Sequence, residues 1–126
     1  MIKVAKAVIL DCEKVLLIKR SASSKFFSSM WDFPGGKVKN CEDSGLCVVR
    51  ETHEETALKI VSSSLILEGE VNLDSESINY SLFLVSEYKG GTIMLSEDHT
   101  EYGWFDREEI ESLDVTPFVE KYFEKS

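Results

Sequence analysis

The chain has 126 residues, a length that suits a single hydrophobic core, and we expect residues 1–126 to form one domain. The net charge of −9 disfavours binding to a phosphate backbone, so we expect no nucleic-acid polymer among the partners. Lysines interrupt the apolar N-terminus and no apolar run is long enough to span a bilayer, so we expect a cytoplasmic protein that contacts no membrane.

Two apolar runs near the N-terminus, residues 4–10 and 15–18, predict two strands joined by a polar turn. Arg20 follows the second run, at the point where a strand gives way to a loop. It is either an ordinary strand-end charge or a contact to a phosphate group of a substrate, and the sequence leaves both interpretations open.

Residues 21–30 are serine-rich and show no periodicity, which is typical of a loop. Phe26 and Phe27 in this segment either anchor the loop in the core or form a wall of a ligand site. The segment WDFPGG follows, and its paired glycines, Gly35 and Gly36, allow the backbone to approach a ligand or metal closely.

The central helix is predicted to begin at Asp43 or Ser44, either of which is a favourable N-cap. We expect Leu46, Val48 and Thr52 to face the core.

Three glutamates on this helix, Glu51, Glu54 and Glu55, lie at positions i, i+3 and i+4, which places their carboxylates on one face. Like charges at this spacing repel one another, so a solvated acidic face is the less favoured interpretation. A divalent cation between the carboxylates removes the repulsion, and Mg²⁺ and Mn²⁺ prefer oxygen ligands. The spacing therefore predicts an Mg²⁺ (or Mn²⁺) site.

The second half of the chain predicts mainly strands. Its expected elements are antiparallel strands at residues 61–73 and 78–88, a turn at 89–91, a short strand at 92–95, a loop at 96–100, a strand at 102–105, and helices at 107–113 and 118–124. Together with the central helix, these elements indicate one domain of the α/β or α+β class.

The stretch from Gly36 to Leu58 resembles the box of the Nudix hydrolase family, G-x5-E-x7-R-E-U-x-E-E-x-G-U, in which U is bulky and aliphatic. The charged positions all match, whereas Thr52 replaces an aliphatic residue and Ala57 replaces the second glycine. A glycine there lets the helix end in a left-handed turn, which costs alanine about 1 kcal/mol, so we expect this helix to end differently. The resemblance implies an α/β/α sandwich, with a mixed sheet and a catalytic helix after the glycine-rich loop.

The resemblance also implies a Mg²⁺-dependent pyrophosphohydrolase and assigns roles to the residues of the box. Glu54 and Glu55 are implied metal ligands, Glu51 is a third ligand or the base, and the Gly36 carbonyl is a further ligand. Arg50 completes the catalytic set. We expect it to pair with Glu42, which then has a structural role within the box.

Outside the box, the loop before the last strand offers Glu97 or Asp98 as a further metal ligand or base, with loop solvation as the alternative. His53 is expected to face solvent, and no role is assigned to His99. Four residues near the box are expected to contact the substrate, namely Arg20, Trp31, Phe33 and Lys37.

The expected partner is a small nucleotide-type molecule, and several classes stay open: a nucleoside triphosphate, a nucleotide sugar, a dinucleoside polyphosphate or coenzyme A. The segment WDFPGG is shared with MutT-type enzymes, but residues 114–118 lack the asparagine that reads purines in that type. A coenzyme A diphosphatase signature is matched in spacing, except at Lys25 and Ser29. A non-catalytic nucleotide-binding module is the rival interpretation, which the three retained glutamates disfavour. The sequence leaves open whether the chain is a monomer or a homodimer.

Overall fold

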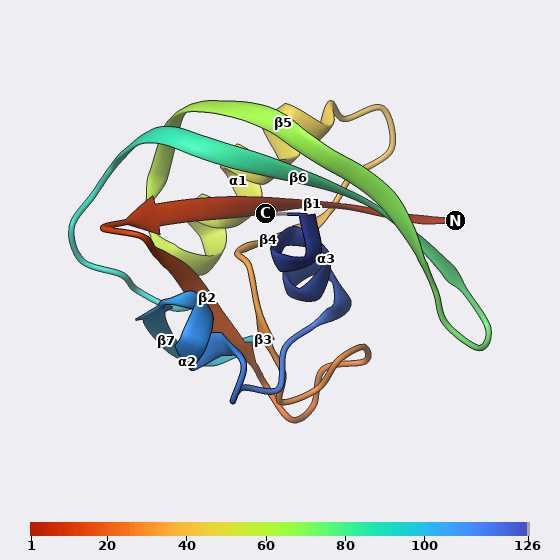
Figure 1. Cartoon of the computed structure of the whole chain (residues 1–126). Coiled ribbons are helices and arrows are strands. Elements are labelled where there is room, and N and C mark those ends of the chain that lie inside the picture. The colour runs from red at the N-terminus through yellow and green to blue at the C-terminus, as the bar shows by residue number, and fades with distance from the viewer. Residues whose placement is uncertain (126) are drawn as a thin grey trace.

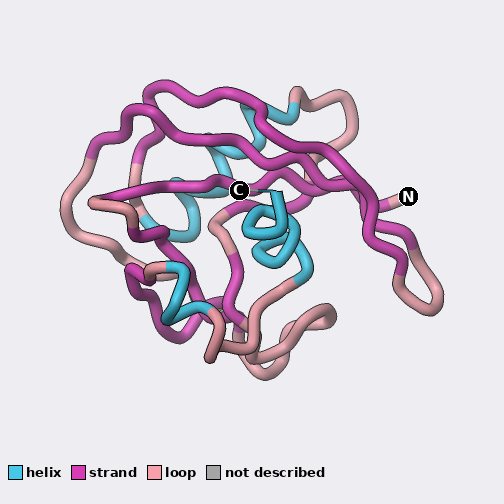
Figure 2. Tube along the Cα trace, viewed as in Figure 1, coloured by secondary structure: helices cyan, strands magenta, loops and turns pink. Residues whose placement is uncertain are grey.

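A computed structural model describes residues 1–125 of the chain (Figures 1 and 2). No helix in this range is long and apolar enough to cross a membrane. The elements in chain order are β1 (Ile2–Asp11), β2 (Lys14–Arg20), β3 (Trp31–Asp32), β4 (Gly35–Lys37), α1 (Ser44–Thr56), β5 (Lys59–Asn72), β6 (Ser77–Lys89), β7 (His99–Phe105), α2 (Arg107–Ile110) and α3 (Pro117–Lys125).

Strand β1 is at the centre of a mixed sheet with the strand order β3-β2-β1-β6-β5. It pairs in parallel with β6 from Ile2 to Ile9, and antiparallel with β4 and β2. Strand β7 pairs with β2 on the edge opposite β3. A parallel pair needs a long crossover connection, and the segment that carries β4, α1 and β5 supplies it.

The alternating side chains of β1 feed two separate cores, one on each face of the sheet. Ala5, Ala7 and Ile9 pack with the buried face of α1, whereas Val4 and Val8 pack with residues of α3. Figure 1 shows α1 and α3 on either side of β1. The predicted α/β/α sandwich is confirmed.

The five longer strands and the last helix lie where the sequence predicted them. The prediction of a short strand at residues 92–95 is wrong. This segment is irregular and bonds to the end of α1 instead of to a strand. The amide of Met94 donates to the Thr56 carbonyl at 2.9 Å, and that of Ser96 donates to the Glu55 carbonyl at 3.2 Å. The helix predicted at residues 107–113 is also shorter and ends at Ile110, followed by tight i+3 turns.

Two expectations about α1 are corrected. Leu46 is 66% exposed, because the buried face is set by Cys47, Val48 and Thr52, and Leu46 lies roughly opposite Val48 around the helix. Ala57 does adopt the left-handed conformation, with φ 68°, and its amide donates to the His53 carbonyl. The turn brings the buried Leu58 into the core, which offsets a cost of about 1 kcal/mol for alanine.

Candidate active site

Helix α1 begins at its predicted N-cap, and the cap fixes which way the glutamates point. The Asp43 carboxylate accepts a hydrogen bond from the Leu46 amide at 3.2 Å, so Asp43, and not Ser44, is the cap. With the opposite face of α1 buried on the sheet, Glu51 lies against β4, Glu55 reaches Gly35, and Glu54 is 55% exposed.

The two glycines of β4 are required by close contacts on both sides of this short strand. A Cβ atom on Gly36 would lie 2.5 Å from Cδ of Glu51. Gly35 has φ 143°, and a Cβ atom there would collide with the backbone of Ala5 in β1. The glycines thus let the strand run between β1 and the glutamate face of α1.

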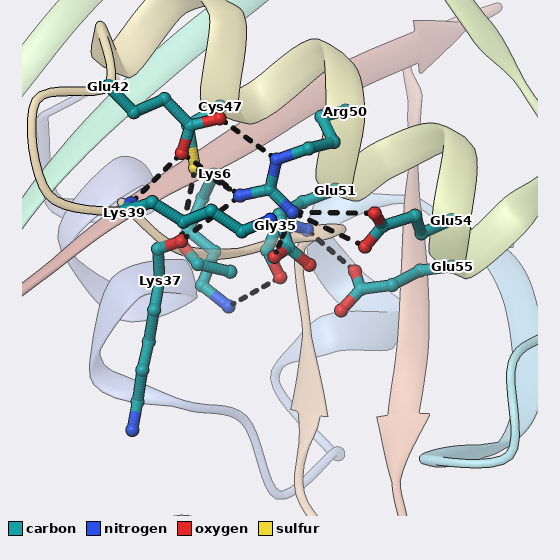
Figure 3. Close-up of polar contacts among 11 residues, drawn as sticks. Lys6, Gly35, Lys37, Lys39, Glu42, Cys47, Arg50, Glu51, Glu54 and Glu55 are labelled. Atoms are coloured by element: carbon teal, nitrogen blue, oxygen red, sulfur yellow. Dashed lines mark hydrogen bonds and ion pairs between the residues drawn. The ribbon is translucent and has the colours of Figure 1, made fainter.

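Arg50 connects the loop before α1 to the glutamates (Figure 3). Its Nε and one terminal nitrogen donate to the two carboxylate oxygens of Glu42 at 2.9 and 3.0 Å, which is the ion pair expected from the sequence. The other terminal nitrogen donates to Glu51 at 2.9 Å and lies 3.4 Å from both oxygens of Glu54. These hydrogen bonds raise the pKa of Arg50 and lower the pKa of Glu42 to about 2.

Glu55 is the one glutamate of the three that Arg50 does not contact. Its Oε1 accepts a hydrogen bond from the Gly35 amide at 2.8 Å. Burial raises the pKa of Glu55 to about 8, although the charge of Lys6 and the Gly35 amide oppose that shift. Within residues 1–125, Glu55 forms no ion pair at salt-bridge distance, and the charge of Lys6 offsets its burial only in part.

The donor set fits a hard divalent cation in its chemistry. No group of three or more His, Cys, Asp or Glu side chains within residues 1–125 is arranged to hold a metal ion, because Glu51 and Glu54 are directed at Arg50 and Glu55 at Gly35. The three side chains nevertheless carry carboxylate oxygens within about one turn of one helix, the donor type that hard divalent cations prefer.

A cavity of about 360 Å³ opens beside Glu55. Its cationic lining residues are Lys6, Arg20, Lys25 and Lys37, and its aromatic lining residues are Phe26, Phe27 and Phe118. The cavity therefore combines a basic environment with aromatic surfaces, in a protein whose net charge is −9. Phe27 in the loop of residues 21–30 is both an anchor and part of the cavity wall. It lines the cavity and also packs edge-on against Phe118, with ring centroids 5.7 Å apart.

The cavity includes some of the residues expected from the sequence and leaves out others. Arg20 and Lys37 line it. Phe33 does not, because it is 1% exposed in the core and packs against Tyr122. Trp31 also lies outside the lining and stacks edge-on with Phe105 at 5.0 Å.

The two acidic residues expected before β7 lie differently with respect to the cavity. Glu97 is exposed and does not line the cavity, whereas Asp98 and His99 do. Burial is the main cause that lowers the pKa of His99 to about 4, so its imidazole is neutral at pH 7. His53 is exposed, as expected.

Comparison with known protein families shows to which family the chain belongs. The model of the NUDIX domain matches residues 2–125. The chain belongs to the Nudix family. The pattern from Gly36 to Leu58 is thus the family's box, despite Thr52 and Ala57, and the chain is a Nudix hydrolase.

Relatives and solved structures agree with this family. A CTP pyrophosphohydrolase of Escherichia coli is 26% identical over 117 residues, covering 93% of this chain and 84% of the relative. An 8-oxo-dGTP diphosphatase of Proteus vulgaris is 28% identical over 86 residues, covering 68% of this chain and 77% of the relative. A crystal structure of a MutT protein from Methanosarcina mazei superposes with a TM-score of 0.88 at 28% identity, covering 98% of this chain and 91% of the other.

Sequence reasoning missed Lys6, which lines the cavity of the Nudix site, and its buried partner Asp32, which lies outside the lining. Lys6 is 3% exposed, and its Nζ lies 2.8 Å from Oδ2 of Asp32, which is 1% exposed. A lysine inside the apolar run VAKAVIL was the available signal, since a charged residue in a buried strand usually has a partner. The partner is 26 residues away in the sequence, and only the fold identifies it.

Proposed function

We propose that this Nudix hydrolase cleaves a diphosphate linkage in a nucleoside triphosphate, using Mg²⁺ or Mn²⁺. The observation that carries the proposal is the single cavity in which the under-compensated carboxylate of Glu55, cationic side chains and aromatic rings meet. A nucleoside triphosphate has the matching parts, namely a polyanionic chain and a flat base. The activities for which the two relatives are named, on CTP and on 8-oxo-dGTP, support the same substrate class.

Glu54 and Glu55, with Glu51 and the Gly36 carbonyl, are the proposed holders of the cation. When bound, a divalent cation neutralises phosphate charge, polarises the phosphoryl group and lowers the pKa of bound water. The chain contributes the remaining positive charge through Arg20 and Lys37, both of which line the cavity.

Two further residues have proposed roles in positioning and in proton transfer. Arg50 holds Glu51 in place through a 2.9 Å hydrogen bond, while its bidentate pair with Glu42 fixes the guanidinium itself. Asp98 is the candidate acceptor for the proton of the attacking water, because it lines the cavity and Glu97 does not.

The test is a screen of nucleoside triphosphates, nucleotide sugars, dinucleoside polyphosphates and coenzyme A, with Mg²⁺ and with products identified. We expect a nucleoside triphosphate to be the best substrate and to yield a nucleoside monophosphate. Activity is expected to disappear in EDTA and to return with Mg²⁺ or Mn²⁺. Full activity in chelator, or a best substrate from another class, would contradict the proposal.

A set of matched variants tests the proposed position of the active site. Glu55→Gln preserves the shape of the side chain and removes a charge, and we expect it to lower turnover by roughly two orders of magnitude or more. Glu97→Gln is the control, because Glu97 is exposed and outside the cavity, and its effect is expected to stay within about threefold. Asp98→Asn is expected to reduce turnover while leaving Mn²⁺ affinity, measured by calorimetry, nearly intact.

A further inference from the structure

Lys6 presents one unused hydrogen-bond donor to the cavity. Its ammonium group has three N–H donors. Oδ2 of Asp32 accepts one at 2.8 Å, and the carbonyl of Gly35 accepts another at 3.4 Å. The side chain is only 3% exposed and is part of the cavity lining. Residues 1–125 supply no third acceptor within hydrogen-bond distance, so the remaining donor is available to a bound molecule.

The charge of Lys6 is partly offset by the buried carboxylate of Asp32, whose Oδ2 also lies 3.5 Å from a terminal nitrogen of Arg20. Asp32 is 1% exposed and is held by hydrogen bonds of 2.8 Å from the Thr116 hydroxyl and from the Phe33 amide. Lys6 therefore attracts a phosphate less than an unpaired lysine would, although Arg20 shares the same carboxylate. Lys6 still needs an acceptor for its free N–H group, and a neutral carbonyl oxygen is a suitable one.

The surroundings of Lys6 match a nucleobase better than they match a phosphate chain. Its Nζ lies 5.5 Å from the centre of the Phe118 ring, and Ile2, Val4 and Phe27 line the same cavity. Bases stack on aromatic side chains and present their polar groups at the ring edge.

We infer that Lys6 is a specificity-determining residue that donates a hydrogen bond to a carbonyl oxygen of the substrate's nucleobase. The inference rests on the proposed nucleoside triphosphate substrate. Lysine has no acceptor, so an exocyclic amino group at the same place meets a donor and leaves both groups unpaired. The site therefore favours a base with a carbonyl over the otherwise matching base with an amino group.

Gly35 links this contact to the proposed metal ligands. Its carbonyl accepts from Lys6 at 3.4 Å, and its amide donates to Oε1 of Glu55 at 2.8 Å (Figure 3). A nucleobase that draws the Lys6 ammonium group toward itself thus weakens the contact of Lys6 with Gly35, whose amide is hydrogen-bonded to Glu55. The selectivity is therefore expected in kcat as well as in KM.

The experiment compares two pairs of nucleotides, ITP with ATP and UTP with CTP, which differ in this group and in the protonation of the adjoining ring nitrogen. In the wild-type protein, kcat/KM of the carbonyl member is expected to exceed that of the amino member by about tenfold or more, in the pair that reacts faster. Lys6→Met removes the donor and keeps the length of the side chain, so the ratio is expected to fall to within about threefold of one. Lys3→Met, an exposed lysine of the same strand, is the control and keeps the wild-type ratio.

Folding and function are separated by further measurements. Lys6→Met leaves Asp32 without its main cation, so the Lys6→Met/Asp32→Asn double variant, which buries no lone charge, is compared as well. An equal loss of kcat/KM for both members of each pair would assign Lys6 to the phosphates or to the fold and overturn the inference, as would a wild-type ratio near one. If no triphosphate is hydrolysed, the proposed function fails, whereas calorimetric binding of the same pairs still decides the role of Lys6.

Discussion

The raised pKa of Glu55 makes a prediction about stability in the absence of metal. The pKa rises from an ordinary 4.5 to about 8, chiefly through burial. A folded-state pKa above the unfolded value means that the native state binds the proton more tightly. The stability contribution is therefore fully present below pH 4.5 and is lost as the pH rises through about 8.

Glu55→Gln is the perturbation that isolates this effect, because glutamine resembles the protonated acid and its carbonyl can still accept from Gly35. A pKa difference of about 3.5 corresponds to roughly 5 kcal/mol as an upper limit. Because the side chain is only half-buried, we reduce this to about 2–3 kcal/mol. Glu55→Gln should thus match the wild type near pH 4.5 and exceed its free energy of unfolding by about 2–3 kcal/mol at pH 9.

The assay is urea unfolding in EDTA across this pH range, with the difference between the two proteins plotted against pH. Titrations of other groups, such as His99, are common to both proteins and cancel in that difference. Glu54→Gln is the control, since Glu54 is exposed, and its difference should stay small at every pH. A Glu55→Gln difference that does not change with pH would refute the reasoning. Added Mn²⁺ should reverse the order by stabilising the wild type more.

Three other substitutions test separate contacts. Gly36→Ala places a Cβ atom 2.5 Å from Cδ of Glu51, so we expect turnover to fall about tenfold or more, while Gly91→Ala, which meets no atom within 4 Å, serves as the control for both kinetics and urea unfolding. Thr52→Val removes a buried hydroxyl that has no partner and should raise the free energy of unfolding by about 1 kcal/mol, so a loss of stability would show that the hydroxyl is satisfied in solution. In Arg50→Lys, the lysine cannot form both hydrogen bonds to the Glu42 carboxylate that the guanidinium forms. We therefore expect kcat to fall more than KM rises in steady-state kinetics. A change in KM alone would indicate that Arg50 contacts the substrate directly.

The sequence by itself determined the features that depend on local spacing. The i, i+3 and i+4 positions of Glu51, Glu54 and Glu55 are enough to place three carboxylates on one helix face. Asp43 caps that helix through a contact only three residues long. Arg50 and Glu42 are eight residues apart, within one loop and the first turns of a helix. The family pattern adds the fold, because it fixes how this helix and its glycine-rich loop are placed against a sheet.

Only the tertiary structure decided which distant residues share the cavity. Phe33 follows Asp32 directly, yet it is part of the core, because the path of the backbone after β3 buries it against Tyr122. Asp32 itself is bound by Lys6 from 26 residues before it and by Thr116 from 84 residues after it. Such contacts leave no local periodicity in the sequence, since they depend on the parallel pairing of β1 with β6 and on the packing of α3 over β1. The buried lysine was visible in the sequence, whereas its partner and its access to the cavity were fixed by the fold.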